Sequence, residues 1–290
     1  MPLLRRCSER WLGLSAQRSL PRWRRDTFWR AAPKLQLASR AELLSAARPV
    51  VLFVDTFNGH LDSENALAAV QVVQAAGYTV HAARGAQDQA VCCGRTWLAA
   101  GLAEQAKARA RQLLDALAPL ARHDIPIVGL EPSCLLTLRD EMLAMGLGND
   151  AQTVAGQALL FEEFVAREAQ AGRFNPPLRA ATRPILVHGQ CHQKAFGSMP
   201  AALAALRLIP GAAPTLIESS CCGMAGAFGY EASHHAVSMQ MAELSLLPAV
   251  RAAPEALIVA DGTSCRHQIL DGAGRQALHL ARVLADHLAA

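Results

Sequence analysis

The chain contains the stretch Val91-Cys92-Cys93-Gly94-Arg95 and, 129 residues later, the matching stretch Ser220-Cys221-Cys222-Gly223-Met224. Two further blocks recur in the same order around them. Val50-Val-Leu-Phe-Val-Asp55 matches Ile185-Leu-Val-His-Gly-Gln-Cys191, and Ile127-Val-Gly-Leu-Glu-Pro-Ser-Cys134 matches Ile258-Val-Ala-Asp-Gly-Thr-Ser-Cys265, at offsets of 136 and 131 residues. Nearly constant offsets in three separate blocks predict two homologous lobes.

In each lobe, short β-branched runs alternate with stretches rich in alanine and leucine. This alternation is typical of βαβ units and predicts an α/β fold with two homologous lobes, parallel sheets and a pseudo-two-fold repeat. We expect helices over 63–76, ending at Gly77, and over 101–120. The expected strands are Val50–Val54, Thr79–Ala82, Ile125–Leu130, Ile185–Val187, Thr215–Ile217 and Leu257–Ala260.

The repeat also predicts the domain organisation. Residues 1–44 form an Arg-rich docking or linker segment, 45–150 the first lobe, 151–180 a helical connector with a turn-prone end, and 181–290 the second lobe. The sequence is 52% hydrophobic, which is enough for a sizeable core. No apolar run approaches the ~20 residues of a membrane-spanning helix.

The first 32 residues carry eight arginines, opposed only by Glu9 and Asp26. Such a start favours a docking segment, with a transit peptide or a lipid-headgroup contact as alternatives. A signal-peptide core is not found there, because the arginines leave only a short apolar run. We therefore expect a cytoplasmic protein, with peripheral contact at the inner membrane as an option, and no nucleic-acid partner.

Eight cysteines in a mid-sized chain of this kind indicate metal binding or redox chemistry. All but Cys7 follow predicted strand ends, where the loops of a parallel sheet converge. In the second lobe these loops bring four thiolates together, the number that an iron-sulfur cluster needs. The predicted ligands are Cys191, Cys221, Cys222 and Cys265, and the predicted group is a [4Fe-4S] cluster, with zinc as the alternative.

The first lobe offers Cys92, Cys93 and Cys134, with Asp55 where the sequence alignment has Cys191. Three thiolates and a carboxylate can hold zinc or an altered cluster, so these four are secondary metal candidates. The missing sulfur favours a degenerate site.

Three histidines lie beside the cysteines of the second lobe: His188 and His192 flank Cys191, and His267 follows Cys265. Imidazole can ligate iron or zinc, donate to a cluster sulfur or relay a proton. We include all three in the cofactor-binding set.

Five stretches resemble one known family. They are Val54-Asp-Thr-Phe57, Gly129-Leu-Glu-Pro-Ser-Cys-Leu-Leu-Thr-Leu-Arg-Asp-Glu141, His188-Gly-Gln-Cys-His-Gln-Lys194, Ser220-Cys-Cys-Gly-Met-Ala-Gly226 and Asp261-Gly-Thr-Ser-Cys-Arg-His-Gln268. Together they resemble the CCG cysteine-rich domain and, more closely, the C-terminal part of fused FAD/iron-sulfur D-2-hydroxyacid dehydrogenases. CCG domains of the heterodisulfide reductase type carry a further cysteine where this chain has Thr137 and Gln268, so the resemblance leaves the cluster type open.

The resemblance implies an electron-transfer module of a flavin-dependent dehydrogenase acting on D-lactate, D-2-hydroxyglutarate or glycolate. FAD would be bound by a partner or a missing domain, a ferredoxin-like segment would deliver electrons, and a quinone or another carrier would accept them. We expect the chain not to oxidise the hydroxyacid alone. The alternatives are a zinc-binding or thiol-disulfide domain and a non-catalytic assembly subunit.

Overall fold

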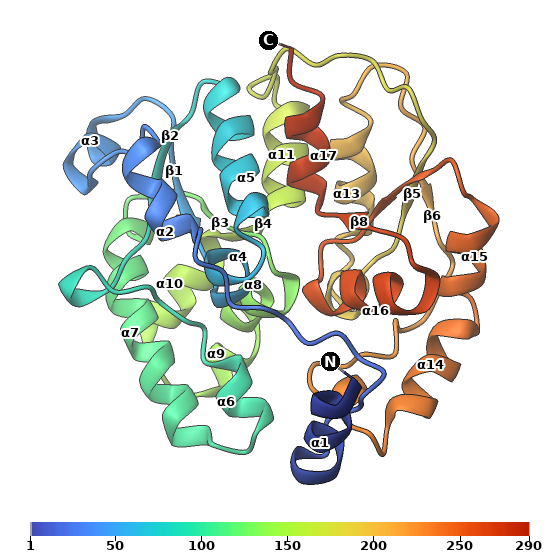
Figure 1. The fold of residues 1–290 in the computed structure, drawn as a ribbon. Helices are drawn as coiled ribbons and strands as arrows, with labels where there is room; N and C mark the ends of the chain where they lie inside the picture. The colour runs from blue at the N-terminus through green and yellow to red at the C-terminus, as the bar shows by residue number, and fades with distance from the viewer. Residues whose placement is uncertain (1, 290) are drawn as a thin grey trace.

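Two sheets of four parallel strands form the framework of the protein (Figure 1). The computed structural model describes residues 2–289, with side chains from Cys7 onward. The first sheet has the order β2-β1-β3-β4 and the second the order β6-β5-β7-β8, so each strand has its counterpart in the other sheet. The strands are β1 (Pro49–Phe53), β2 (Thr79–Ala82), β3 (Ile127–Gly129), β4 (Ala158–Leu160), β5 (Ile185–Val187), β6 (Thr215–Leu216), β7 (Leu257–Val259) and β8 (Ala277–Leu278).

The predicted α/β fold with two homologous lobes is confirmed. All six expected strands are present, within two residues of their predicted ends, but β4 and β8 were not predicted. β4 lies inside the segment 151–180, for which the sequence predicted a helical connector with a turn-prone end, and it pairs with β3. Its Ala-Leu-Leu sequence has no β-branched residue, and such a short apolar run cannot be told from a helix by its pattern.

The helices follow the strands and cover the sheets. They are α1 (Pro2–Leu12), α2 (Phe28–Ala31), α3 (Arg40–Ser45), α4 (Thr56–His60), α5 (Ser63–Ala75), α6 (Arg95–Ala99), α7 (Ala103–Ala121), α8 (Pro132–Arg139), α9 (Glu141–Ala144), α10 (Asn149–Gln157), α11 (Phe161–Gln170), α12 (Cys191–Ala195), α13 (Met199–Leu206), α14 (His235–Glu243), α15 (Leu246–Ala252), α16 (Thr263–Ala273) and α17 (Leu280–Asp286). The end of α5 at Gly77 agrees with the sequence prediction, since this glycine has a φ of +82°, where a side chain would be strained.

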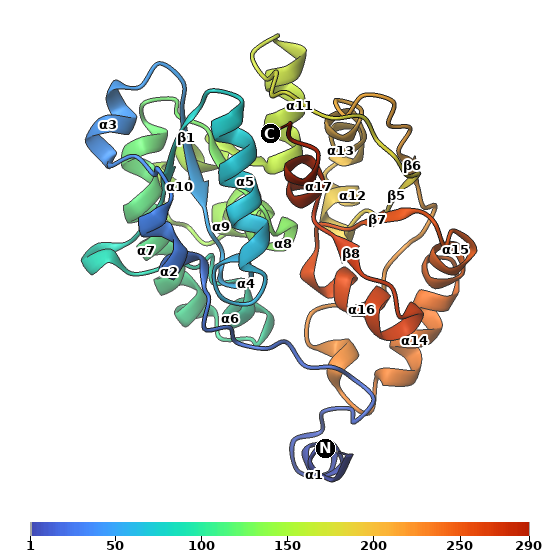
Figure 2. The same ribbon diagram turned by 45° about the horizontal axis from the view of Figure 1, so that its top comes forward.

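The lobes are held together by helices of each lobe that pack against helices of the other (Figure 2). Helix α17 ends the second lobe but packs on α5 of the first, while α11 ends the first lobe and packs on α13 of the second. One hydrophobic core therefore runs through both lobes and includes the fully buried Phe161, Phe164 and Leu280. This packing of helices across the lobe boundary fixes the two sheets relative to each other.

Both sheets have their topological switch point beside the cysteine loops. In the first sheet β1 lies between β2 and β3, and in the second β5 lies between β6 and β7. The chain leaves β5 and β7 in opposite directions, and ligands of open α/β sheets bind at the carboxyl ends of the strands at such switch points. Cys191 follows β5 and Cys265 follows β7, so the two flank the switch point.

The Arg-rich N-terminal segment crosses from the second lobe to the first (Figures 1 and 2). Arg18 is buried and donates from Nε to Gly229 O at 2.7 Å and from Nη2 to Ser238 Oγ at 2.8 Å. The backbone N–H of Arg24 donates to His60 O on the first lobe at 3.0 Å. Much of this segment thus docks on its own chain. Among the helices of residues 2–289, none combines the length and the apolar character needed to cross a membrane.

Candidate metal centre

The second lobe gathers four cysteines from three loops at the switch point. Cys191 is the first residue of α12, Cys221 and Cys222 lie in the loop after β6, and Cys265 is the third residue of α16. Cys191 is exposed and Cys221 half-buried, whereas Cys222 and Cys265 are almost completely buried. The site therefore has an inner and an outer side.

A glycine permits the tight turn that presents the vicinal cysteines. Gly223 has a φ of +86°, and a Cβ at this position would lie 2.1 Å from the carbonyl oxygen of Ser238. Only glycine fits here, both for conformation and for space. The turn also directs the backbone N–H of Gly223 at Cys221 Sγ, 3.2 Å away, as a donor to the sulfur.

The four thiols form one interacting group. Contacts with the Cys191 and Cys222 thiols lower the pKa of Cys221, and the Cys222 thiol, assisted by His188, lowers the pKa of Cys265. The pKa of Cys191 is raised because its hydrogen is shared with Cys221. Since metals bind thiolates, two sulfurs of this group are already biased toward the binding form.

His188 belongs to the inner side of this group. A ring nitrogen of His188 and the sulfurs of Cys222 and Cys265 all lie within 4.8 Å of one another. The ring is only 1% exposed, and its Nε2 has no hydrogen-bond partner within residues 2–289. Nδ1 lies 3.0 Å from Ser219 Oγ.

A cationic side chain supports the cysteine loop from behind. Lys194 Nζ donates to Ser219 O, and to Ser220 O at 2.8 Å, so it binds the two carbonyls that precede Cys221. Its positive charge also counteracts the raised pKa of Cys191.

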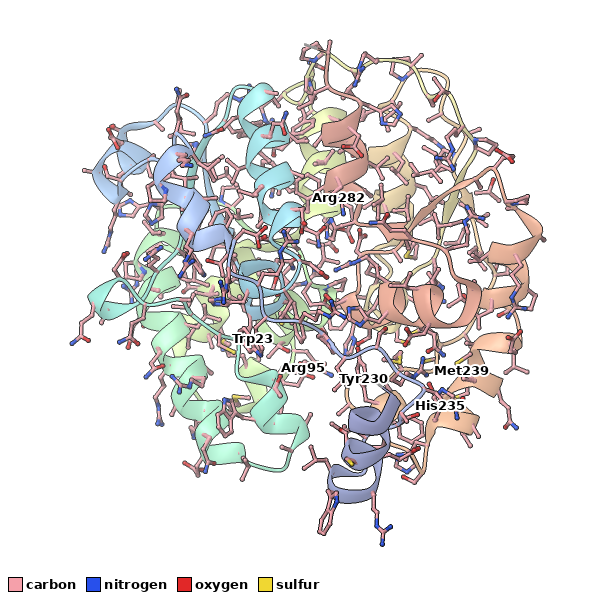
Figure 3. All side chains as sticks on the ribbon, in the orientation of Figure 1. Trp23, Arg95, Tyr230, His235, Met239 and Arg282 are labelled. Carbon is pink, nitrogen blue, oxygen red and sulfur yellow. The ribbon has the colours of Figure 1, made fainter. Side chains whose placement is uncertain are left out.

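The other two predicted histidines are engaged elsewhere. Arg95, which follows the first Cys-Cys-Gly, donates from Nη2 to His192 Nε2 at 2.8 Å and so connects the two lobes. Figure 3 shows Arg95 at the side of its lobe that faces the second lobe. Burial and the Arg95 charge lower the pKa of His192. Nδ1 of His267 and the Tyr230 hydroxyl share a hydrogen bond of 2.8 Å.

The first lobe repeats the geometry with different side chains. Cys92 and Cys93 precede Gly94, whose φ is +84° and whose added Cβ would lie 2.6 Å from Ala106 O. Cys134 is the third residue of α8, as Cys265 is of α16. These three thiols form a second group, with Cys93 and Cys134 buried.

The strand register changes the predicted correspondence between the lobes. Val51 pairs with Ile127 in the first sheet, and Leu186 pairs with Ile258 in the second. Because Ile127 matches Ile258 in the repeat, Val51 corresponds to Leu186. Counting on from these two residues, Thr56 corresponds to Cys191 and Asp55 to Gln190. The sequence alignment of Asp55 with Cys191 is thus one residue out of register. A threonine hydroxyl, in contact with Cys92, takes the place of the fourth thiol.

Asp55 acts as a helix cap. It is 2% exposed, and its carboxylate accepts from the N–H groups of Phe57 and Asn58 at 2.9 and 3.1 Å and from Asn58 Nδ2 at 2.7 Å. Gln190 caps α12 in the same way, by accepting from His192 N–H. Capping of the first turn of α4 therefore explains why an aspartate stands at position 55.

Carboxylates give the first site an unfavourable potential for thiolates. The Cys93 thiol lowers the pKa of Cys134, but burial and the nearby Asp55 and Glu131 outweigh this and raise it to about 11. Contact with Cys93, together with burial, likewise raises the pKa of Cys92. All three thiols of this group have raised pKa values, whereas in the second lobe the pKa values of Cys221 and Cys265 are lowered and only those of Cys191 and Cys222 are raised.

Three residues near the two thiol groups were not predicted from the sequence: Thr56, Glu131 and Ser219. Hydroxyls and carboxylates near cysteines are common in sequences, and only the structure shows that these three belong to the sites. The buried Glu131 accepts from Thr263 N–H of the second lobe at 2.9 Å, and burial followed by the Asp55 charge raises its pKa to about 7. An offset of 135 residues in the first block would have revealed the pairing of Thr56 with Cys191.

The residues of the second lobe fit a thiophilic metal group. Four sulfurs approach from three loops, a backbone amide points at one of them, and a buried imidazole nitrogen lacks a partner among the described residues. Soft thiolates with imidazole suit iron-sulfur clusters and zinc. Hydrogen bonds from backbone amides to sulfur are a usual means of tuning such groups.

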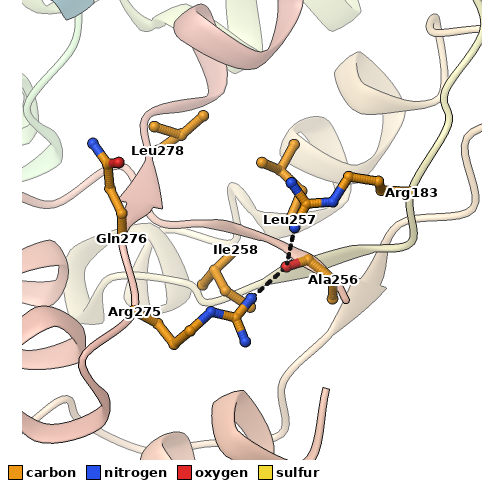
Figure 4. Close-up of a pocket in the computed structure, with 7 residues that line it drawn as sticks. All are labelled: Arg183, Ala256, Leu257, Ile258, Arg275, Gln276 and Leu278. Carbon is orange, nitrogen blue, oxygen red and sulfur yellow. Dashed lines mark hydrogen bonds between the residues drawn. The ribbon is translucent and has the colours of Figure 1, made fainter. Parts of the chain in front are cut away.

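A shallow cavity of about 280 Å³ lies at the amino ends of the strands of the second sheet, on the side away from the cysteines (Figure 4). It is lined by residues at the amino ends of β7 and β8, and Arg275 Nη2 donates there to Ala256 O at 2.7 Å. The cysteines follow the carboxyl ends of the strands, so this cavity is no part of the metal centre.

A family model for the cysteine-rich domain CCG matches residues 56–139 and 185–270, more than half of the chain. The chain belongs to the CCG family. The two matches coincide with the two lobes, and the resemblance predicted from sequence is confirmed.

Curated CCG relatives are similar over larger regions. D-2-hydroxyglutarate dehydrogenase of Escherichia coli (strain K12) is 27% identical over 292 residues, covering 98% of this chain and 27% of that protein. One of the subunits of the anaerobic glycerol-3-phosphate dehydrogenase of the same strain is 27% identical over 199 residues, covering 68% of this chain and 50% of that relative. The chain thus spans a quarter to a half of these relatives.

Proposed function

We propose that this CCG protein transfers electrons through an iron-sulfur cluster held by Cys191, Cys221, Cys222 and Cys265. The observation that carries the proposal is the convergence of these four thiols from three loops at the switch point of the second sheet. Two of them have lowered pKa values, and a glycine amide donates to one. The first lobe, whose three thiols have raised pKa values, would serve as a structural counterpart.

The accessibility of the site suits electron transfer. Cys191 is exposed, and the loop that follows Gly223 presents the small, exposed residues Ala225, Gly226 and Ala227. A cluster bound here would lie close to the surface, so that a redox partner can approach it. The buried Cys222 and Cys265 would hold it on the inner side.

We further propose that the electron donor is a flavoprotein that oxidises a D-2-hydroxyacid, with a ferredoxin-like carrier between them. The similarity to D-2-hydroxyglutarate dehydrogenase over nearly the whole chain supports this partner. Because the match covers about a quarter of that protein, we assign the flavin chemistry to the region outside the match. The substrate and FAD would therefore not be bound by the residues described here.

A quinone is the proposed acceptor, which would bring the protein to a membrane surface. Helix α1 supports such a contact, because Trp11 is 80% and Leu12 71% exposed beside the basic Arg10. Tryptophan with arginine is typical of interfacial helices.

Zinc is the second candidate, favoured by the compact group of His188, Cys222 and Cys265. Metal and sulfide analysis of anaerobically purified protein separates the two, together with EPR spectra after reduction. We expect about four iron and four sulfide per chain, lost in Cys222→Ser. One zinc without iron would reject the electron-transfer proposal.

A further inference from the structure

We propose that His188 is itself a ligand of the metal centre, bound through Nε2 beside Cys222 and Cys265, so that the centre has mixed imidazole and thiolate coordination. The inference deepens the proposed function and rests on it for the nature of the metal. Cys191 and Cys221 would bind on the exposed side, and the two buried sulfurs on the inner side. Since the four thiolates already supply one ligand to each iron of a [4Fe-4S] cluster, His188 would be an additional ligand of an inner iron that Cys222 or Cys265 also holds.

The first observation is an unpartnered nitrogen deep in the protein. The ring is 1% exposed, and Nε2 makes no hydrogen bond to any described residue. A buried polar atom without a partner costs free energy, so native structures nearly always satisfy it with a group or a ligand. Since the neighbouring atoms are the Cys222 and Cys265 sulfurs, a metal between them satisfies all three.

The second observation is the position of Ser219 beside the other ring nitrogen. Ser219 Oγ lies 3.0 Å from Nδ1, and it accepts from Lys194 Nζ at 3.2 Å. With its hydrogen on Nδ1 and donated to Ser219 Oγ, His188 would present the lone pair of Nε2 to the sulfurs, as in metal sites where a second partner orients the imidazole.

The third observation comes from the repeat. By the strand register, Phe53 is the position of the first lobe that corresponds to His188, just as Thr56 corresponds to Cys191. Phe53 is completely buried. The lobe that lacks the fourth thiol therefore also lacks the imidazole, and both differences remove a metal ligand from the same site.

Pulsed EPR of the reduced cluster tests the proposal directly. Protein loaded anaerobically should display the ¹⁴N coupling of a bound imidazole, converted to a ¹⁵N coupling by labelled histidine. His188→Ala should lose it, while His192→Ala, the matched control beside Cys191, should retain it. An intact iron and sulfide content without any histidine coupling would overturn the role of His188 and leave the cluster proposal standing.

Titration of the metal-free chain with Co²⁺ gives a second readout that needs no cluster. We expect His188→Gln, which keeps a buried polar side chain, to bind Co²⁺ at least about 10-fold more weakly, with a changed visible spectrum. Circular dichroism would verify that the variant is folded. Unchanged Co²⁺ affinity and spectrum would reject the ligand role even if the protein were to contain no iron.

Discussion

The two lobes share strand order, helix starts and three cysteines, yet among the described residues only the second brings four thiols and a buried imidazole together. Thr56 and Phe53 stand where the second lobe has Cys191 and His188. The surroundings of the matched cysteines also differ. Burial, together with the Asp55 and Glu131 charges, raises the pKa of Cys134, whereas Cys222 and His188 lower the pKa of Cys265. A duplicated cysteine motif thus predicts the frame of a metal site, while the neighbouring charges and the fourth ligand decide whether the site can function.

The largest effect should separate matched cysteines. Cys221→Ser removes a proposed ligand whose pKa is lowered, and we expect nearly all iron and the visible absorbance to be lost. Cys92→Ser, at the corresponding position, should leave both unchanged. Iron and sulfide analysis of the two variants, purified side by side, measures the difference. Equal loss in both variants would contradict the distinction between the lobes.

A second change should convert the first site toward the second. Phe53→His with Thr56→Cys supplies the two ligands that the first lobe lacks, so we expect the Co²⁺ stoichiometry to rise from one to two per chain. Thr56→Cys alone is the control and should give a weaker second site. If the double variant folds and still binds a single Co²⁺, the two missing ligands do not account for the difference.

The glycines of the two Cys-Cys-Gly motifs offer a comparison of stability. Gly223→Ala and Gly94→Ala each introduce a Cβ at positive φ against a carbonyl oxygen, 2.1 Å and 2.6 Å away. We expect each to lower the free energy of unfolding by about 2–4 kcal/mol. Chemical denaturation checks this, and only Gly223→Ala should also lose iron.

The smallest expected effect concerns Glu131, whose place in the second lobe is taken by Gly262. Its pKa of about 7 exceeds the usual 4.5, so the folded protein binds the proton more tightly than the unfolded chain. The stabilisation of the folded protein by this proton is fully present below pH 4.5. It is lost as the pH rises to 7, which lowers the free energy of unfolding by up to about 3 kcal/mol. Five histidines with lowered pKa values act in the opposite direction.

Glu131→Gln isolates the single group, because the amide can still accept from Thr263 N–H. The stability difference between the wild type and this variant should shift in favour of the variant between pH 4.5 and 7. A difference that does not depend on pH would mean that Glu131 has the same pKa in the folded and the unfolded protein, which contradicts the raised pKa.

The sequence predicts the lobes and the cysteine group well, since offsets and soft ligands are local signals. It does not predict β4 and β8, whose short apolar sequences are stabilised as strands only by pairing with β3 and β7. It also misassigns Asp55, because the correspondence of Thr56 with Cys191 depends on strand register. The sequence predicts a docking or linker segment over residues 1–44, but the buried hydrogen bonds of Arg18 to Gly229 and Ser238 are long-range and cannot be read from composition.

The most direct test of the account is the iron and sulfide content, with a quantified EPR signal, of a variant in which Cys92, Cys93 and Cys134 are all serine. The account predicts the wild-type content of one cluster per chain, because the second lobe supplies every ligand. Loss of the cluster, or of half of the iron, would contradict it and would assign a metal to the first lobe.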